Sequence, residues 1–330
     1  MNVAIYSTHK FEKDYLEKAN NGKHNFKYIT SLLSSETAHL AEGCEAVSIF
    51  VSDDASALVL QLLNKFGVRF LALRSAGFNH VDVAEAKKLN IKVARVAEYS
   101  PYSVAEHSVA LMLALNRKLI RAHNRVMEQN FSLDGLVGFD MNGKTVGIIG
   151  TGKIGSVAAK ILHGFGCKIL AYDQFESDEL KQKYNVTYTD YQMLCKQSDI
   201  ITLHVPLTDK TKYIINKDSI KMMKTGVMLI NTSRGKLVNT KDVINALKSG
   251  HIGSLGIDVY EEEEGLFFED HSETILQDDT IARLMSFRNV LITSHQAFLT
   301  DTALKNIAET TVYNLDCFAK SGDNKNEIKV

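Results

Sequence analysis

The stretch that decides the fold reads VGIIGTGKIG at residues 146–155, where an apolar strand runs through three closely spaced glycines into a helix. In this context the GxGxxG pattern is typical of dinucleotide binding. Gly150 permits a tight turn, Gly152 lets the backbone approach a pyrophosphate, and Gly155 lets helix and strand pack closely. The N–H groups that open the helix then stabilise the phosphates. The stretch therefore predicts a dinucleotide site on a βαβ unit.

The next predicted strand, residues 168–172, leads directly into Asp173, which lies 18 residues after Gly155. A carboxylate at about this spacing accepts hydrogen bonds from the adenosine ribose hydroxyls. It would also repel a 2′-phosphate, so the predicted cofactor is NAD rather than NADP.

Apolar strands and helical patterns alternate on both sides of this stretch, which indicates βαβ units and parallel sheets. Helices are predicted at residues 12–20, 55–66, 83–89 and 103–120, and a last helix at 301–319 is expected to pack back onto the first block. No element is assigned to the polar insertion at 265–288. The predicted strands are residues 3–6, 26–29, 46–51, 70–73, 91–96, 145–149, 168–172, 200–205, 227–231, 255–259 and 290–293.

Length and charge exclude several classes of protein. A chain of 330 residues favours about two domains, and 45% hydrophobic with 23% charged residues excludes a disordered chain. With 38 basic and 39 acidic residues the net charge is -1, which gives no electrostatic reason to expect nucleic acid or an anionic membrane as a partner.

Cysteine usage and the N-terminus predict a cytoplasmic protein without a metal site. The start of the chain reads as a strand rather than a signal peptide, and no apolar run reaches the length of a membrane span. Scattered cysteines without a CxxC pair favour reduced thiols over a disulfide framework or a zinc site; they are Cys44, Cys167, Cys195 and Cys317.

Arg234 lies in the loop NTSRG, residues 231–235, at the end of a predicted strand. Ligands of open parallel sheets bind beyond the carboxyl ends of strands, and a guanidinium can bind a carboxylate with two parallel hydrogen bonds. The loop therefore indicates an anion-binding arginine, although a surface arginine in a polar loop is the ordinary alternative.

Three histidines compete for the role of proton donor in carbonyl–alcohol chemistry. His295 follows the predicted strand 290–293, and His204 also ends a strand, beside Pro206. His107 lies in the middle of a predicted helix, where an ordinary structural role is favoured. The acidic run at residues 261–264 could supply a carboxylate that stabilises an imidazolium, but the pattern leaves open which glutamate does so.

At this point the motifs resemble those of the D-isomer-specific 2-hydroxyacid dehydrogenases, and within that family they are most similar to the bacterial fermentative D-lactate dehydrogenases. Besides the glycine fingerprint, the resemblance rests on RSAGFN at 74–79, AEYSP at 97–101, VPL at 205–207, NTSRG at 231–235, GIDVYE at 256–261 and HQAFLT at 295–300.

The resemblance implies a catalytic set of Arg234, Glu263 and His295, in which Glu263 is chosen because it lies five residues after Asp258. Arg234 would hold the 2-oxo acid, His295 would protonate the forming alkoxide, and Glu263 would hold the imidazole. The implied substrate residues are Ala76, Gly77, Tyr99, Arg234, His295 and Phe298. The implied cofactor residues are Gly150, Gly152, Lys153, Ile154, Gly155, Asp173, Val205, Pro206, Thr232, Ser233, Arg234, Asp258 and His295.

The implied fold is α/β, with two flavodoxin/Rossmann-like doubly wound parallel-sheet domains and an active-site cleft between them. Residues 1–100 plus 298–330 would form the substrate domain and residues 101–297 the NAD-binding domain. A homodimer or homotetramer is expected.

The implied reaction is the reversible reduction of pyruvate to D-lactate by NADH, as in fermentation. Dehydrogenation of larger D-2-hydroxy acids, of the 2-hydroxyisocaproate or phenyllactate type, is the alternative within the family. An NAD-sensing, corepressor-like binding protein is the alternative from another class. One position departs from many relatives, because Thr211 stands where they carry an asparagine that contacts the cofactor.

Overall fold

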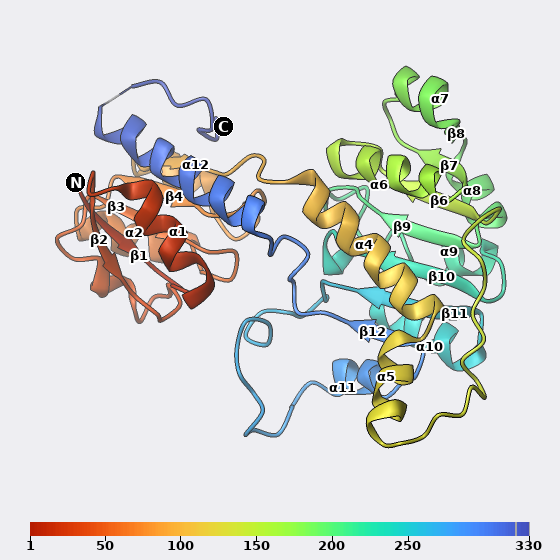
Figure 1. Ribbon diagram of the computed structural model, residues 1–330. Helices are drawn as coiled ribbons and strands as arrows, with labels where there is room; N and C mark the ends of the chain where they lie inside the picture. The colour runs from red at the N-terminus through yellow and green to blue at the C-terminus, as the bar shows by residue number, and fades with distance from the viewer. Residues whose placement is uncertain (321, 330) are drawn as a thin grey trace. The chain divides into compact units, whose positions relative to one another are not determined.

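The computed structural model describes residues 1–320 and 322–329. By their contacts they divide into two compact units, Met1–Ser100 with Leu299–Val330, and Pro101–Phe298. Each unit contains one sheet whose strands pair in parallel and are joined by helices (Figure 1). The predicted fold class of two α/β, Rossmann-like parallel-sheet folds is confirmed.

The first unit is built on a five-stranded sheet in the order β2-β1-β3-β4-β5. Its helices cover both faces, so that Val3 and Ile5 pack in the same cluster as Leu16 and Leu315, while Ala4 packs in the opposite cluster. The strands are β1 (Asn2–Ile5), β2 (Asn25–Tyr28), β3 (Ala46–Ile49), β4 (Phe70–Leu73) and β5 (Lys92–Ala94), and the helices are α1 (Lys10–Asn20), η1 (Ala38–Ala41), α2 (Ala57–Lys65), α3 (Val83–Lys88) and α12 (Asp301–Ala319).

The last helix returns to this first sheet. Figure 1 shows α12 beside α1, and polar contacts join α12 to α1 and to the turn that follows it. Tyr15 donates to Asp301 at 2.8 Å, and Lys23 pairs with Asp316 at 2.9 Å. The first unit is therefore assembled from both ends of the chain.

The second unit is built on a seven-stranded sheet in the order β12-β11-β10-β9-β6-β7-β8. Its strands are β6 (Thr145–Ile149), β7 (Lys168–Tyr172), β8 (Thr187–Tyr188), β9 (Ile200–Leu203), β10 (Val227–Asn231), β11 (Ile252–Ile257) and β12 (Val290–Ile292). Its helices are α4 (Pro101–Asn116), α5 (Leu119–Met127), α6 (Lys153–Gly164), α7 (Asp178–Tyr184), α8 (Tyr191–Gln197), α9 (Lys217–Met222), η2 (Gly235–Leu237), α10 (Thr240–Ser249) and α11 (Asp279–Met285).

The order of this sheet fixes where a ligand can bind. From β6 the chain runs outward through β7 and β8, and it then returns to β9 on the other side of β6. Such a reversal opens a crevice at the carboxyl ends of the two strands that flank it. The glycine fingerprint after β6 and His204 after β9 both lie at that point.

The prediction of one helix over residues 103–120 is wrong. Pro101 opens α4, since a proline fits the first turn of a helix, but α4 ends at Asn116 and α5 begins at Leu119. Between them Lys118 adopts a left-handed backbone with φ 51°. Leu111, Leu115 and Leu119 keep helical spacing across the break, and for that reason the sequence did not reveal it.

The polar insertion at 265–288 begins with turns and ends in α11, which Asp278 caps by accepting hydrogen bonds from the amides of Thr280 and Ile281. No helix in the part of the chain that the structure describes is both long and apolar enough to cross a membrane.

Candidate active site

The glycine fingerprint forms a tight strand-to-helix turn. A Cβ at Gly155 would lie 1.9 Å from the Gly150 carbonyl oxygen, and a Cβ at Gly150 would lie 2.7 Å from the His204 carbonyl oxygen. A Cβ at Gly152, in contrast, would lie in open space among the described residues. Gly152 precedes α6 and has no side chain to cap it, so the first-turn N–H groups can receive an anion. The loop fits the pyrophosphate of NAD.

Asp173 lies at the tip of β7 and is tied to the fingerprint. Its Oδ2 accepts from the Thr151 amide at 2.6 Å and its Oδ1 from the Phe175 amide at 2.9 Å. The Thr151 hydroxyl lies 2.9 Å from the hydroxyl of Tyr188 on β8. The carboxylate is thus held where the ribose of a bound NAD is expected. Sequence reasoning missed Tyr188, since a two-residue strand leaves no pattern.

His295 and Glu263 form the closest acid–base pair among the predicted residues. Nδ1 of His295 lies 3.1 Å from Oε1 of Glu263, while Oε2 of Glu263 accepts from the Tyr260 amide at 3.0 Å. Both side chains are partly exposed. Since a carboxylate only accepts, Nδ1 of His295 carries a proton. The other ring nitrogen, Nε2, therefore points away from Glu263.

The structure shows which glutamate of the acidic run at 261–264 contacts His295. Glu261 is engaged elsewhere, because it accepts from the hydroxyls of Tyr213 and Thr240. Glu263 is the member of the run that faces His295. The ring of Phe268, which sequence reasoning did not single out, lies 5.7 Å from the imidazole, centroid to centroid.

The competing His204 is unsuited to proton donation. Burial lowers the pKa of His204 to about 4, so the imidazole is neutral at pH 7. Its Nε2 lies 3.0 Å from the Thr202 hydroxyl. The residue therefore packs under the fingerprint as part of the fold.

Arg234 follows β10 in a loop shaped by two close contacts. Asn231 accepts from the Ser233 amide at 3.0 Å and donates to the Arg234 carbonyl oxygen at 2.9 Å. A Cβ at Gly235 would lie 2.0 Å from the Tyr260 carbonyl oxygen, so only glycine lets this loop pass the strand end that leads to Glu263. Arg234 and His295 accordingly follow the carboxyl ends of β10 and β12 in one sheet.

Val205 and Pro206, two further predicted cofactor residues, lie in the loop after β9. The Ser233 hydroxyl donates to the Val205 carbonyl oxygen at 3.2 Å, and the Thr211 hydroxyl donates to the Pro206 carbonyl oxygen at 2.6 Å. Thr211 therefore closes this loop with its own hydroxyl. Lys153 and Ile154 open α6, and Thr232 directly follows β10. Their contacts with the cofactor stay predictions.

Asp258 is wholly buried at the end of β11, and its carboxylate accepts hydrogen bonds from residues on both sides of His295. Oδ1 accepts from the Thr293 hydroxyl at 2.5 Å and from the Gln296 amide at 2.9 Å, while Oδ2 accepts from the Ala297 amide at 2.8 Å. Asp258 thus holds the loop that carries His295.

The predicted substrate residues Ala76, Gly77 and Tyr99 belong to the first unit, whereas Phe298 is buried in the second. Two hydrogen bonds order the loop that holds Ala76 and Gly77. Ser75 donates to the Gly77 carbonyl oxygen at 2.7 Å, and Arg95 donates to the Ala76 carbonyl oxygen at 2.8 Å. The part these residues play in substrate binding stays a prediction.

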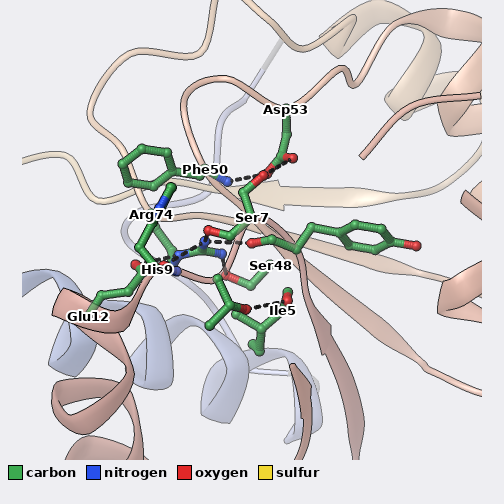
Figure 2. Close-up of polar contacts among 10 residues, drawn as sticks. Ile5, Ser7, His9, Glu12, Ser48, Phe50, Asp53 and Arg74 are labelled. Atoms are coloured by element: carbon green, nitrogen blue, oxygen red, sulfur yellow. Dashed lines mark hydrogen bonds and ion pairs between the residues drawn. The ribbon is translucent and has the colours of Figure 1, made fainter. Parts of the chain in front are cut away.

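Arg74, which precedes this loop, is fully buried in a polar cluster at the carboxyl ends of the first sheet (Figure 2). The guanidinium donates to both carboxylate oxygens of Glu12, at 2.9 and 3.0 Å, and to the Tyr6 carbonyl oxygen at 2.7 Å. Beside it Asp53 accepts from the Ser7 hydroxyl at 2.6 Å. The cluster ties β1, β3 and α1 to the start of the Ala76 loop.

Within residues 1–320 and 322–329, no three His, Cys, Asp or Glu side chains are grouped so as to hold a metal ion.

Comparison with known proteins identifies the class. The family model described as D-isomer specific 2-hydroxyacid dehydrogenase, NAD binding domain, matches residues 109–297. The chain is 48% identical to D-lactate dehydrogenase of Escherichia coli over 329 residues, covering 99% of this chain and 100% of that protein.

Solved structures agree with the sequence comparison. The apo-structure of the E. coli D-lactate dehydrogenase superposes with a TM-score of 0.91 at 46% identity, covering 100% of both chains. D-Lactate dehydrogenase from Aquifex aeolicus, complexed with NAD and lactic acid, superposes at 0.86 and 36% identity, covering 97% of this chain and 96% of that one.

The fold and the fingerprint define an oxidoreductase that uses NAD. The chain belongs to the family of D-isomer-specific 2-hydroxyacid dehydrogenases.

Proposed function

We propose that the protein is an NAD-dependent D-lactate dehydrogenase that reduces pyruvate to D-lactate and catalyses the reverse reaction. The observation that carries the proposal is the His295–Glu263 pair, a proton donor held by a carboxylate on the sheet that also bears the glycine fingerprint. Its support is the 48% identity to the E. coli D-lactate dehydrogenase along the whole chain.

The protein's own residues divide the work of substrate binding and proton transfer. NAD(H), when bound, supplies or accepts the hydride at C2 of the substrate. Arg234 holds the carboxylate of the 2-oxo acid and polarises its carbonyl with its planar guanidinium. His295 gives its Nε2 proton to the carbonyl oxygen as that oxygen becomes a hydroxyl, and it takes the proton back in lactate oxidation.

Glu263 accepts from Nδ1 of His295 and so keeps Nε2 directed at the substrate oxygen. Its negative charge also stabilises the imidazolium from which the proton is transferred. The amides of Ala76 and Gly77 would bind the substrate carboxylate, and Tyr99 and Phe298 would limit the space for the substrate side chain. These roles rest on the resemblance to the family.

The reaction is tested by following NADH at 340 nm with pyruvate, 2-oxoisocaproate and phenylpyruvate, and NAD⁺ reduction with D- and L-lactate. Pyruvate and D-lactate are expected to give the highest kcat/KM in their directions. A preference for the larger 2-oxo acids would assign the chain to the alternative within the family. NADH binding without turnover of any of them would favour a cofactor-sensing binding protein.

His295→Ala is expected to lower kcat by about 10²–10⁴-fold, which is the usual contribution of a general acid. NADH binding, followed by its fluorescence, should remain. Unchanged turnover in this variant would contradict the assignment.

We also propose that the chain forms a homodimer or homotetramer. None of the residues of α5 is buried, and the helix exposes large apolar side chains such as Ile120 and Met127. The segment after it exposes more of them, among them Phe131 (72%) and Leu133 (79%). Arg125 donates to the Asp134 carbonyl oxygen at 2.7 Å and so holds this segment against α5. An ordered apolar patch of this kind marks a protein interface. Sedimentation of Phe131→Glu beside the unaltered chain tests the proposal.

We further propose a cytoplasmic location. Its support is the state of the cysteines: Cys44, Cys167, Cys195 and Cys317 are all free thiols in the structure. Fractionation of the source cells with an activity assay would test it.

A further inference from the structure

A chain of hydrogen bonds joins the long helix α4 to the loop of His295. Nε2 of His107 lies 3.0 Å from the Thr293 hydroxyl oxygen and 3.5 Å from Oδ1 of Asp258. The Thr293 hydroxyl lies 2.5 Å from the same carboxylate oxygen. His107 and Thr293 are 186 residues apart in sequence, so only the fold brings them together.

The direction of each hydrogen bond follows from the chemistry of the groups. A carboxylate can only accept, so the Thr293 hydroxyl donates its proton to Asp258. Since that proton is used, the Thr293 oxygen must accept from His107, whose Nε2 therefore carries a proton. His107, Thr293 and Asp258 form a one-way relay that ends on the carboxylate.

The charge of the Asp258 carboxylate depends on the hydrogen bonds that it accepts. Burial alone would raise its pKa, but hydrogen bonds from His107, Thr293 and the amides of Ala297 and Gln296 hold the pKa below the usual range. A wholly buried carboxylate must be satisfied by hydrogen bonds to remain charged.

The carboxylate in turn fixes the backbone around His295. It accepts from the amides of Gln296 and Ala297, and the carbonyl oxygen of Asp258 accepts from the His295 amide at 2.7 Å. His295 has a φ of 49°, in the left-handed region that residues other than glycine rarely adopt. Such a conformation persists only when its surroundings over-determine it.

We propose that His107 is a positioning residue of the reaction: through the Thr293 hydroxyl and the Asp258 carboxylate, it holds residues 293–297 in the conformation that orients the His295 imidazole. This role rests on the proposed function of His295. It extends that proposal, because it gives α4, a helix elsewhere in the second unit, a part in orienting the proton donor.

The surroundings of His107 favour this role over ordinary packing. The helix α4 buries Leu111 and Met112, one turn further along, among apolar neighbours. His107 instead directs a donor at the end of β12, where both groups it meets are polar. An apolar side chain would fill the same space but would leave the Thr293 oxygen without this donor.

The test uses the full-length protein and four variants: His107→Leu, His107→Gln, Thr293→Val and the double variant His107→Leu/Thr293→Val. Glutamine keeps an N–H donor at about the position of Nε2, whereas leucine keeps only the bulk. For each we measure melting temperature, NADH affinity by fluorescence, and kcat and KM for pyruvate.

His107→Leu is expected to lower kcat at least about tenfold while KM for pyruvate and NADH affinity change less than about threefold, because Arg234 and the fingerprint lie in other loops. His107→Gln should recover most of kcat. The double variant should lose no more than the worse single variant, as expected for residues that act through one relay.

A kcat for His107→Leu within twofold of the unaltered protein would overturn the inference. So would a loss of kcat that glutamine does not recover, or one that adds fully to the loss in Thr293→Val. If the unaltered protein itself does not reduce any 2-oxo acid, the proposed function fails instead, and the two failures are thereby distinguished.

Discussion

The imidazole Nδ1 of His295 lies 3.1 Å from the Glu263 carboxylate, although the two residues are 32 positions apart and follow different strands of the sheet. β11 and β12 are parallel neighbours, so their carboxyl ends lie at one edge. The polar insertion therefore begins at this edge, beside Glu263, and crosses to the amino end of β12, from which that strand leads back to His295.

The Glu263–His295 contact predicts the behaviour of Glu263→Gln. The amide keeps the shape of the side chain but removes the charge that stabilises the imidazolium. We expect kcat for pyruvate reduction to fall about 10–100-fold, equivalent to about 1.4–2.8 kcal/mol of lost transition-state stabilisation.

Glu264→Gln is the matched control, because Glu264 is exposed in the same acidic run and the variant changes net charge equally. Equal losses in the two variants would show that general electrostatics, rather than the contact with His295, supports the rate.

The sequence predicted the elements that are buried on both faces. β6, β9 and β10 are nearly continuous apolar runs because helices cover both faces of a parallel sheet. It did not predict β8, which has two residues. It also missed the end of α4, where Lys118 is left-handed although Leu115 and Leu119 keep helical spacing across the break.

The sequence placed Asp173, Arg234 and His295 after strand ends, and the strands of the structure end just before them. Their roles in binding and catalysis stay predictions. Contacts between distant side chains were not predictable. The position of His107 in an apolar helix gave no sign of Thr293, since that contact depends on how α4 crosses the sheet.

The second and third glycines of the fingerprint, Gly152 and Gly155, should respond differently to alanine. In Gly155→Ala the new Cβ meets the Gly150 carbonyl oxygen at 1.9 Å, so the backbone must shift and the melting temperature should fall. In Gly152→Ala the Cβ enters open space, so the melting temperature should hold. That space is where the pyrophosphate approaches, and NADH affinity should drop about tenfold, or about 1.4 kcal/mol.

Gly164→Ala provides the control at the far end of α6, where a Cβ also meets open space. It should leave NADH affinity unchanged. Tight NADH binding by Gly152→Ala would mean that the pyrophosphate does not approach this glycine.

Asp173→Ala tests the choice of cofactor. Loss of the carboxylate removes the acceptor for the ribose hydroxyls and the repulsion of a 2′-phosphate. The ratio of kcat/KM for NADH over NADPH should fall at least about tenfold. Asp178→Ala, on the exposed start of α7, is the control. A protein that already prefers NADPH would contradict the role of Asp173.

Arg74→Met should destabilise the first unit strongly. The change leaves the Glu12 carboxylate buried without its guanidinium, and breaking a buried pair in this way costs about 3–5 kcal/mol. Replacing Glu12 by leucine in the same chain should recover part of the loss. Chemical denaturation gives the free energies of unfolding.

Lys88→Met breaks the surface pair with Glu85 and should barely change the unfolding midpoint. If Arg74→Met is as mild as this control, the buried cluster does not stabilise the unit.

His204 makes stability depend on pH within a defined window. Because burial lowers the pKa of His204 from 6.5 to about 4, the unfolded chain binds a proton below pH 6.5 that the folded protein does not. The sign follows: this contribution to stability is complete above about pH 6.5 and is lost as the pH falls toward 4, with a limit of about 3 kcal/mol. Buried carboxylates with lowered pKa values, such as Asp258, lose stability at still lower pH.

The measurement is the free energy of unfolding between pH 8 and pH 4.5 for the unaltered protein and for His204→Gln, in which the amide can still bond the Thr202 hydroxyl. The variant has no group that titrates at this position, so its curve should fall less steeply below pH 6.5. His24, whose pKa burial also lowers, is present in both chains and does not affect the difference between them. Two parallel curves would mean that the imidazole of His204 takes up its proton in the folded protein as readily as in the unfolded chain.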